Sequence, residues 1–446
     1  MKTAIKHTVL ATAIAAGFIA TQASRAEPAR ANTATLQRSV GAFSAIELSG
    51  PYQVVVRAHG KPSIELSGAR KNLDEIETVV RGDTLVVRPI KRSGFYFSFG
   101  KRNDSVTVTI TAPVLKSLKM SGSGDVELEH VTGERLSISV DGPGDLKASG
   151  AVRDLAVRSS GSGDADLHRV KASNVDVAMS GPGDVRLASV GNELLATVSG
   201  SGDLDAHDLR VARVSARMSG PGNINLSGSS EELRAEITGS GDFEACDLAA
   251  ERVSTVQRGP GNACVNGAIK KFEAEVHGSG DLTANGLQAQ SALVRMTGPG
   301  DVTLSGTSAD LHADVSGSGD LEASALSVRR ATVKSRGPGN VGLASVSDTL
   351  DADLRGSGSL AASMQGKRLL LKMSGPGSAQ IEGSVDLVNA QLSGSGRLEA
   401  RRLLANRADI AVRGPGGAAV NLASRAGDER ASLLLVDRSG TRHAVE

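Results

Sequence analysis

The 446-residue sequence contains 53 glycines but no tryptophan, and aromatic residues make up only 2% of it. So little bulky apolar volume argues against one large globular core and favours a narrow interior lined by Ala, Val and Leu. Lys and Arg together number 50 and Asp and Glu 49, without a block of like charge, so the composition gives no electrostatic footprint for binding nucleic acid or acidic lipids.

Residues 1–26 have the three parts of a secretory signal peptide. Lys2 and Lys6 supply the positive charge, a short apolar run follows, and small residues stand before the expected cleavage site. Glu27 is therefore the expected first residue of the mature protein, and residues 27–39 its flexible N-terminus. Because no later stretch approaches the ~18 apolar residues of a membrane span, we expect no transmembrane segment after signal cleavage. The predicted location is the periplasm or the outer cell surface.

Residues 40–120 are expected to form an N-terminal β part that includes a cap. The irregular segment KRSGFYFSFGKR holds four of the nine aromatic residues of the chain: Phe95, Tyr96, Phe97 and Phe99. The favoured interpretation is that these side chains cover the open end of the repeat core that follows, since the ends of a stacked array must be closed. The other interpretation is an exposed aromatic tip, flanked by Lys and Arg, that contacts a membrane surface or a protein partner.

Residues 121–417 repeat the motif G-[SP]-G sixteen times, with 19 or 20 positions from one copy to the next. The first glycines of the motif are Gly122, Gly142, Gly161, Gly181, Gly200, Gly220, Gly239, Gly259, Gly278, Gly298, Gly317, Gly337, Gly356, Gly375, Gly394 and Gly414. The middle residue alternates between Ser and Pro without exception, so the duplicated unit is a pair of repeats with a period of about 39. A short fixed period is typical of a solenoid, in which each unit buries its apolar side against its neighbours.

Apolar and polar residues alternate within each repeat. Examples are Val214, Ala216 and Met218 before one G-x-G, and Val302 and Leu304 after another. A period of two bounded by turn residues predicts short strands, and hence an all-β parallel solenoid. A coil of roughly 19–20 residues and a wide coil of about 39 both fit the repeat. The scarcity of aromatics to fill a wide interior favours the shorter coil, with sixteen corners stacked over about 75 Å.

The motif G-x-G-D predicts the corner of each coil. Glycine tolerates positive φ and close backbone approach, proline presets φ for a turn, and an Asp carboxylate can accept hydrogen bonds from nearby backbone N–H groups. Residues predicted to form such corners are, for example, Gly122, Gly124 and Asp125 in one repeat, Gly161, Gly163 and Asp164 in a second, and Gly200, Gly202 and Asp203 in a third.

The residue after G-x-G is mostly Asp, sometimes Asn, and near the end Ser359, Ser378, Arg397 and Gly417. Stacked carboxylates could bind Ca²⁺, as Gly-Asp turns do in calcium-binding β-rolls. Those rolls, however, repeat every nine residues, and an Arg cannot be a cation ligand. We therefore favour a hydrogen-bonding turn residue and predict no metal site.

His168, His207 and Cys246 share one position in three successive pairs of repeats. Zinc or copper would accept such ligands, but one ligand in every second coil gives a spacing of about 9.6 Å. An outward polar position is therefore favoured. The two cysteines, Cys246 and Cys264, stand at different offsets in neighbouring repeats, which predicts about 8 Å between them. A disulfide needs about 7 Å or less, so the offset disfavours the bridge.

The segment from Val40 onward resembles the autotransporter-adhesin head domain known as the GIN domain. The resemblance lies in "FSAIELSGPYQVVV", "SIELSG", "NLDEIETVVRGDTLVVRP" and "SVTVTITAPVLKSLKMSGSGDVEL", followed by the G-S-G-D turns. It covers nearly all of the mature chain and implies a right-handed parallel β-helix, exported, with an adhesive or envelope role. The family brings no catalytic residues with it.

The functional hypothesis is a non-enzymatic, exported repeat scaffold that acts in adhesion or in contact with an envelope or cell-surface partner. We predict no catalytic residues and no cofactor, because acidic residues recur evenly instead of gathering in one place, and no nucleophile motif occurs. The alternative is a periplasmic β-helix protein that binds or cleaves polysaccharide. Residues 418–446, in which the pattern decays, are the expected C-terminal cap and tail.

Overall fold

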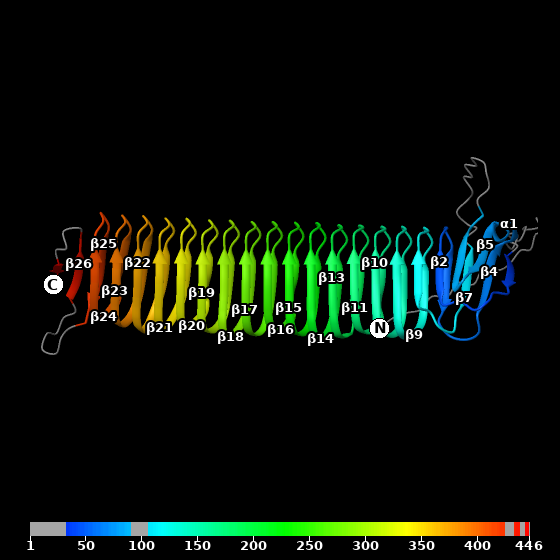
Figure 1. Ribbon diagram of the computed structural model, residues 1–446, viewed down its shortest axis with the longest axis horizontal. Helices are drawn as coiled ribbons and strands as arrows, with labels where there is room; N and C mark the ends of the chain where they lie inside the picture. The colour runs from blue at the N-terminus through cyan, green and yellow to red at the C-terminus, as the bar shows by residue number, and fades with distance from the viewer. Residues whose placement is uncertain (1–32, 91–105, 424–431, 438–441, 446) are drawn as a thin grey trace, which may run out of the picture.

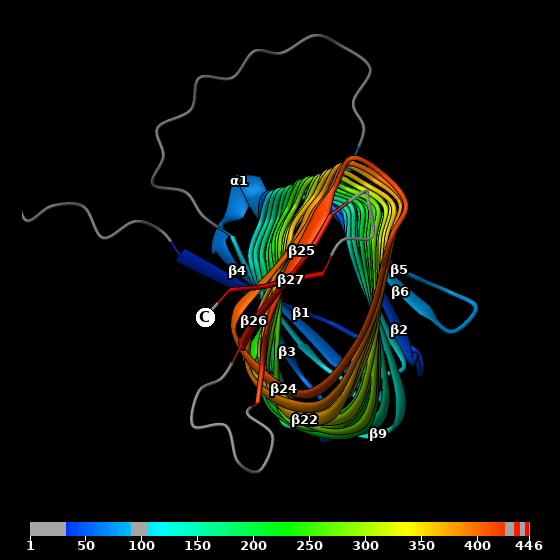
Figure 2. The same cartoon turned by 90° about the vertical axis from the view of Figure 1, so that its left-hand side faces the viewer.

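The protein is an elongated β-solenoid of about 15 stacked turns, seen in a computed structural model that describes residues 33–90, 106–423, 432–437 and 442–445 (Figure 1). Among these residues the one helix is the short α1, Arg70–Leu73. The view along the axis shows the coils superimposed around a closed interior (Figure 2). The prediction of an all-β parallel solenoid is confirmed.

The strands fall into an N-terminal group, a long array and a C-terminal pair. The N-terminal group is β1 (Thr33–Arg38), β2 (Ala45–Leu48), β3 (Gln53–Arg57), β4 (Ser63–Ala69), β5 (Ile76–Arg81), β6 (Thr84–Pro89), β7 (Thr107–Thr111) and β8 (Ser117–Met120). The array is β9 (Val126–Val140), β10 (Leu146–Ser159), β11 (Ala165–Met179), β12 (Val185–Ala188), β13 (Val190–Val198), β14 (Leu204–Met218), β15 (Ile224–Ile237), β16 (Phe243–Gln257), β17 (Ala263–Val276), β18 (Leu282–Met296), β19 (Val302–Val315), β20 (Leu321–Ser335), β21 (Val341–Leu354), β22 (Leu360–Met373), β23 (Ser378–Leu392), β24 (Arg397–Val412) and β25 (Gly417–Leu422). The C-terminal pair is β26 (Ser432–Val436) and β27 (Arg442–Val445).

Most coils of the array are one long strand, bent twice, that pairs in parallel with the next coil, and one coil is divided into β12 and β13. Leu204 of β14 lies opposite Ile224 of β15, and Met218 lies opposite Ile237. The partner thus stands 19 or 20 positions further along the chain, and one coil takes up that length of sequence. The wide coil of twice this length is excluded.

Three inward-facing runs per coil build the core. In β14 they are Leu204 and Ala206, then Leu209 and Val211, then Val214, Ala216 and Met218, all at most 4% exposed. Equivalent side chains of successive coils lie one strand spacing apart, so the interior is a set of apolar stacks. Small and medium-sized side chains fill this narrow interior, as the composition predicts.

The first bend of each coil explains why the repeat is a pair. The pairing of β14 with β15 shifts by one residue between Ala206 and Leu209, because the coil after a G-S-G corner has one residue more at this bend. Several of the shorter coils after G-P-G turn there on a glycine at positive φ, such as Gly228 (φ 122°) or Gly306 (φ 116°). Coils that take up 20 and 19 positions therefore alternate, and together they give the period of 39.

The corners bring backbone against backbone. A Cβ placed on Gly202 would lie 2.1 Å from the carbonyl oxygen of Gly183 in the preceding coil, and one on Gly200 would lie 2.0 Å from that of Gly181. The Gly202 N–H donates to the Gly181 carbonyl at 3.2 Å. Glycine is required here by this close approach, because any side chain would displace the neighbouring coil.

The solenoid begins earlier than residue 121, where the sequence analysis places its start. Gly50, in the turn between β2 and β3, accepts a hydrogen bond from the Gly124 N–H (3.2 Å), and Leu48 lies opposite Met120. The stretch 49–52 is therefore an additional corner that the G-x-G search misses, because Tyr52 stands where the second glycine would be.

The N-terminal end differs from the prediction in a second respect. Part of the stretch 27–39, expected to be flexible, is instead the strand β1, which pairs antiparallel with β4. β4 pairs antiparallel with β7, and β5 with β6, while α1 contacts β4 and β1. These antiparallel strands continue the sheets beyond the first coil. At the opposite end, β26 and β27 add antiparallel strands to β25.

Substitution of a corner glycine should destabilise the fold strongly. We expect Gly202→Ala to lower the free energy of unfolding by about 2–4 kcal/mol, since its methyl group would overlap the Gly183 carbonyl. The control is Gly191→Ala, whose added Cβ would meet only the Ala172 carbonyl at 3.8 Å, an ordinary contact. Denaturant titration of both variants measures the difference. Equal stability of the two would contradict the close-approach argument.

Candidate functional site

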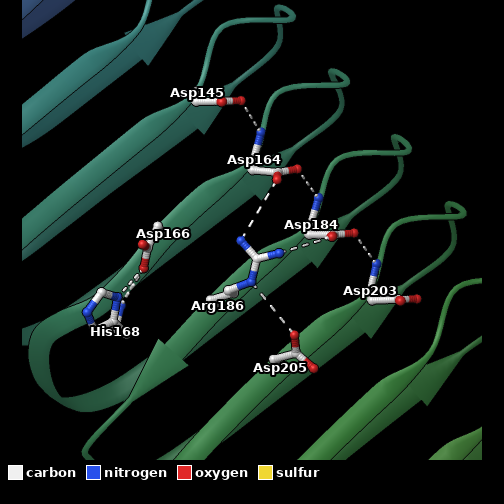
Figure 3. Close-up of polar contacts among 8 residues, drawn as sticks. All are labelled: Asp145, Asp164, Asp166, His168, Asp184, Arg186, Asp203 and Asp205. Atoms are coloured by element: carbon white, nitrogen blue, oxygen red, sulfur yellow. Dashed lines mark hydrogen bonds and ion pairs between the residues drawn. The ribbon is translucent and has the colours of Figure 1, made fainter.

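A ladder of carboxylate hydrogen bonds runs along the corner edge of the solenoid (Figure 3). The backbone N–H of Asp164 donates to Asp145 Oδ1 at 3.0 Å, that of Asp184 to Asp164 Oδ1 at 3.0 Å, and that of Asp203 to Asp184 Oδ1 at 2.9 Å. The same bond recurs at each following corner through the residues Asn223, Asp242, Asn262, Asp281, Asp301, Asp320, Asn340 and Ser359. It begins with Asp125, whose Oδ1 accepts from Asp145.

The ladder gives each of these side chains a backbone N–H partner in the next coil. Asp and Asn both present an Oδ1 acceptor, so either fits: the Asp242 N–H donates to Asn223 Oδ1 at 2.8 Å. A hydrogen bond to a charged carboxylate is stronger than one to a neutral amide oxygen. In both cases the Oδ1 atom of the ladder side chain accepts a hydrogen bond that joins two adjacent coils.

The second carboxylate oxygens of two ladder residues, Asp164 and Asp184, meet a basic side chain. Arg186 lies 3.4 Å from Asp184 Oδ2 and 3.9 Å from both Asp164 Oδ2 and Asp205 Oδ2, so that one guanidinium links three coils (Figure 3). With Arg186 about half exposed, these ion pairs contribute modestly. They form a network of ion pairs on the surface of the solenoid.

The residues of the histidine column have polar partners on their own or adjacent coils. His168 is hydrogen-bonded to Asp166 (Figure 3), and His207 Nδ1 lies 3.1 Å from Ser227 Oγ. Burial acts to raise the pKa of Asp166, but its hydrogen bonds with His168 outweigh this and lower it. Each of these side chains uses a partner on its own or the adjacent coil, and the part of the chain that the structure describes holds no group of three or more metal-type ligands.

Cys246 and Cys264 form a disulfide, so the interpretation that disfavoured it is wrong. Their Cα atoms are 5.3 Å apart. The expected separation of about 8 Å assumed straight strands, whereas the pairing of β16 with β17 breaks between Ala245 and Ala249 at the first bend. The bend takes Cys246 out of the extended path, so its actual distance from Cys264 is shorter.

The aromatic segment with Phe95, Tyr96, Phe97 and Phe99 lies outside the described residues. Its attachment points are described: β6 and β7 lie beside β2 and β3, which flank the corner at Gly50. Whether the segment caps the core or contacts a partner stays a prediction.

The described surface has several shallow hollows spread along the solenoid. One of them, of about 570 Å³, spans five coils around Gly191, Arg210 and Ser229. Its two carboxylates are engaged with basic side chains, Glu231 with Arg252 at 3.5 Å and Glu251 with Lys270 at 2.9 Å. Other hollows lie near each end, for example one of about 410 Å³ beside Arg401.

A second line of charged residues runs along the second bend, and we call it the second-bend column. Its members lie opposite one another in successive coils, in the order Arg135, Asp154, Asn174, Glu193, Arg213, Glu232, Arg252, Lys271, Ser291, Asp310, Arg330, Thr349, Arg368, Leu387 and Arg407.

Acidic members of the second-bend column form ion pairs with some of its arginines. Arg213 lies 3.4 Å from Glu193 and 3.5 Å from Glu232. Arg330 makes two hydrogen bonds to Asp310, of 2.5 and 2.8 Å, and these lower the pKa of that carboxyl. The G-x-G motif does not reveal this column, but its signal in the sequence is the change between basic and acidic residues at one position from repeat to repeat.

Stacked parallel coils, glycine corners and a hydrogen-bonded acidic ladder define a β-solenoid of the kind that presents a long repetitive surface. The family described as "Putative auto-transporter adhesin, head GIN domain" matches this chain over residues 42–207, 189–286, 266–363 and 347–427. The chain therefore belongs to the GIN-domain family.

Solved structures give a weaker likeness. A crystal structure titled a "putative adhesin" from Bacteroides fragilis NCTC 9343 is 22% identical, with a TM-score of 0.38, and covers 56% of this chain and 96% of its own. A "putative adhesin" from Parabacteroides distasonis ATCC 8503 is 17% identical, with a TM-score of 0.34 and coverage of 66% and 97%. No curated protein matches significantly. Across the described ranges, no helix has the length and hydropathy to cross a membrane.

Asp203 tests the ladder. We expect Asp203→Ala to reduce the free energy of unfolding by about 1–2 kcal/mol, because the Asn223 N–H loses its acceptor. Asp203→Asn should lose much less of this free energy, since an amide oxygen serves the same function at Asn223, Asn262 and Asn340. Denaturant titration of the two variants measures the difference.

The ladder is also expected not to depend on a bound cation. Thermal unfolding with added Ca²⁺ and with a chelator should give the same midpoint. A rise of the midpoint with Ca²⁺ would instead favour a cation ladder.

Reduction should loosen the coils that the disulfide joins. For a closed loop of this size, with a sequence separation of 18, we expect a loss of about 3 kcal/mol on treatment with a phosphine reductant. Hydrogen exchange of β16 and β17 amides measures the effect locally, which suits a stacked array that need not unfold in one step. The double variant Cys246→Ser/Cys264→Ser is the control and should not respond. Unchanged exchange in the native chain would count against the bridge.

Proposed function

We propose that this protein is a non-enzymatic, exported scaffold whose long side surface mediates adhesion or another contact at the cell envelope. The observation that carries the proposal is the continuous ladder from Asp125 to Ser359, which makes one corner chemically like the next. A surface of that kind can repeat a weak contact many times, so that affinity comes from multivalency. Membership in the GIN-domain family supports the same role.

The proposal that the protein is not an enzyme rests on how its polar groups are used. A hydrolase of polysaccharide needs two carboxylates converging on one bond. In the described coils the acidic side chains recur once per corner, and Oδ1 is committed to the next coil. The carboxylates of the hollow around Gly191, Glu231 and Glu251, are held by ion pairs. This arrangement favours a scaffold over the polysaccharide-cleaving alternative.

Export and location are the parts of the proposal that need the first experiment. The sequence of residues 1–26, which lie outside the described residues, supports passage across the inner membrane. We expect protease added to intact cells to cleave the chain, detected with an antibody to the solenoid. A periplasmic protein should resist the protease in the same cells, as the control for an intact envelope.

Cleavage on intact cells would be followed by attachment assays with a deletion strain, in which the proposal requires reduced attachment. Cleavage only after permeabilisation would overturn the adhesive role and favour one inside the envelope. A variant lacking residues 1–26 should stay in the cytoplasm, and export of that variant would contradict the assignment of the signal peptide.

A further inference from the structure

The charge of the solenoid reverses near its C-terminal end. Residues 121–360 contain 33 acidic and 21 basic side chains, whereas residues 361–423 contain 4 acidic and 8 basic ones. The reversal is sharpest in the second-bend column. Up to Arg330 its arginines have acidic neighbours, but beyond Arg330 the interleaved positions are Thr349 and Leu387.

The last two arginines of the column consequently lack a counter-charge. Arg368 and Arg407 are exposed, and neither has an ion pair or hydrogen bond among the described residues. The nearby carboxylates are engaged elsewhere: Asp348 with Lys367 at 4.0 Å, and Asp386 with the Asn406 amide at 2.9 Å. Asp409 lies close to Arg407 on the same described strand, β24, without forming an ion pair with it.

The column presents its guanidinium groups at a regular interval. Arg330, Arg368 and Arg407 occupy β20, β22 and β24, with one uncharged coil position between each pair. At the usual strand spacing, every second coil corresponds to about 9.6 Å. Arginine pairs with carboxylates in a bidentate geometry, so a line of them suits a ligand whose anionic groups recur along a chain.

We propose that the edge formed by Arg368 and Arg407 binds a linear acidic polysaccharide with widely spaced carboxylates, whereas the Arg330 guanidinium is already held by Asp310. Charge complementarity supports this ligand, and so does the spacing, which matches a polymer with one carboxylate per disaccharide. Duplex nucleic acid has one charge per about 1.7 Å. A polyanion of that density would place phosphates against Asp348 and Asp386, which lie between the basic positions.

The experiment uses the mature full-length chain and hyaluronan, a polymer with one carboxylate per disaccharide. We expect saturable binding that weakens as salt rises. The variant Arg368→Gln/Arg407→Gln should bind about tenfold or more weakly. The matched control is Arg213→Gln/Arg252→Gln, which removes two arginines of the same column that have acidic neighbours and should leave the affinity unchanged.

A second variant pair keeps the test independent of folding defects. Leu387→Glu places an acid between Arg368 and Arg407, as Glu232 lies between Arg213 and Arg252, and should abolish binding. Leu387→Gln, of the same size but neutral, should retain it. The unfolding midpoint of each variant verifies that the coils are intact.

Four outcomes would overturn the proposal: no binding of hyaluronan, equal loss in both arginine pairs, equal binding of neutral dextran, or tighter binding of duplex DNA or of vesicles containing an anionic lipid. The last would assign the edge to a nucleic acid or a membrane. Binding by purified protein does not depend on cellular location, so failure here is distinguishable from failure of the proposed scaffold function.

Discussion

The close approach of backbone to backbone at the corners is the constraint on which the rest of the solenoid depends. The carbonyl oxygen of each corner glycine lies where the next coil would place a Cβ, as with Gly163 above Gly144 at 2.0 Å. The corners therefore stack in one register and set the length of every coil. Because strand side chains alternate between inside and outside, a coil can gain one residue only where alternation is interrupted. The first bend is that place, and there the pairing shifts.

The pairing of unlike coils also solves an electrostatic problem. Equivalent outward residues of a solenoid lie one strand spacing apart, so identical coils would set like charges side by side, which destabilises a sheet. Two kinds of coil allow basic and acidic residues to alternate, as with Arg213 between Glu193 and Glu232. The Ser/Pro alternation at the corners thus accompanies differences between the two kinds of coil at the first bend, in length, and at the second bend, in charge. A repeat of one identical coil could not place opposite charges on adjacent coils.

Features that depend on neighbouring residues could be predicted from the sequence, whereas those that depend on how coils meet could not. The corners and the inward positions such as Val214 and Met218 follow from glycine spacing and alternation. The disulfide could not be predicted, because the bend that brings Cys246 near Cys264 depends on how one coil packs on the next. Likewise, Tyr52 hides the corner at Gly50, and β1 is stabilised only by its pairing with β4. The direction of the ladder, from one coil to the next, also needed the structure.

The backbone and the side chains contribute separately to holding the coils together. The ladder of side-chain acceptors reaches Ser359 and gives way to Ser378, Arg397 and Gly417. The corner backbone bonds nevertheless continue unchanged: the Gly396 N–H donates to Gly375 at 3.2 Å, and the Gly416 N–H to Gly394 at 3.2 Å. The backbone therefore maintains the stack without the carboxylates. That independence leaves the outward positions of the C-terminal coils free to change, and it is there that arginines without acidic partners accumulate.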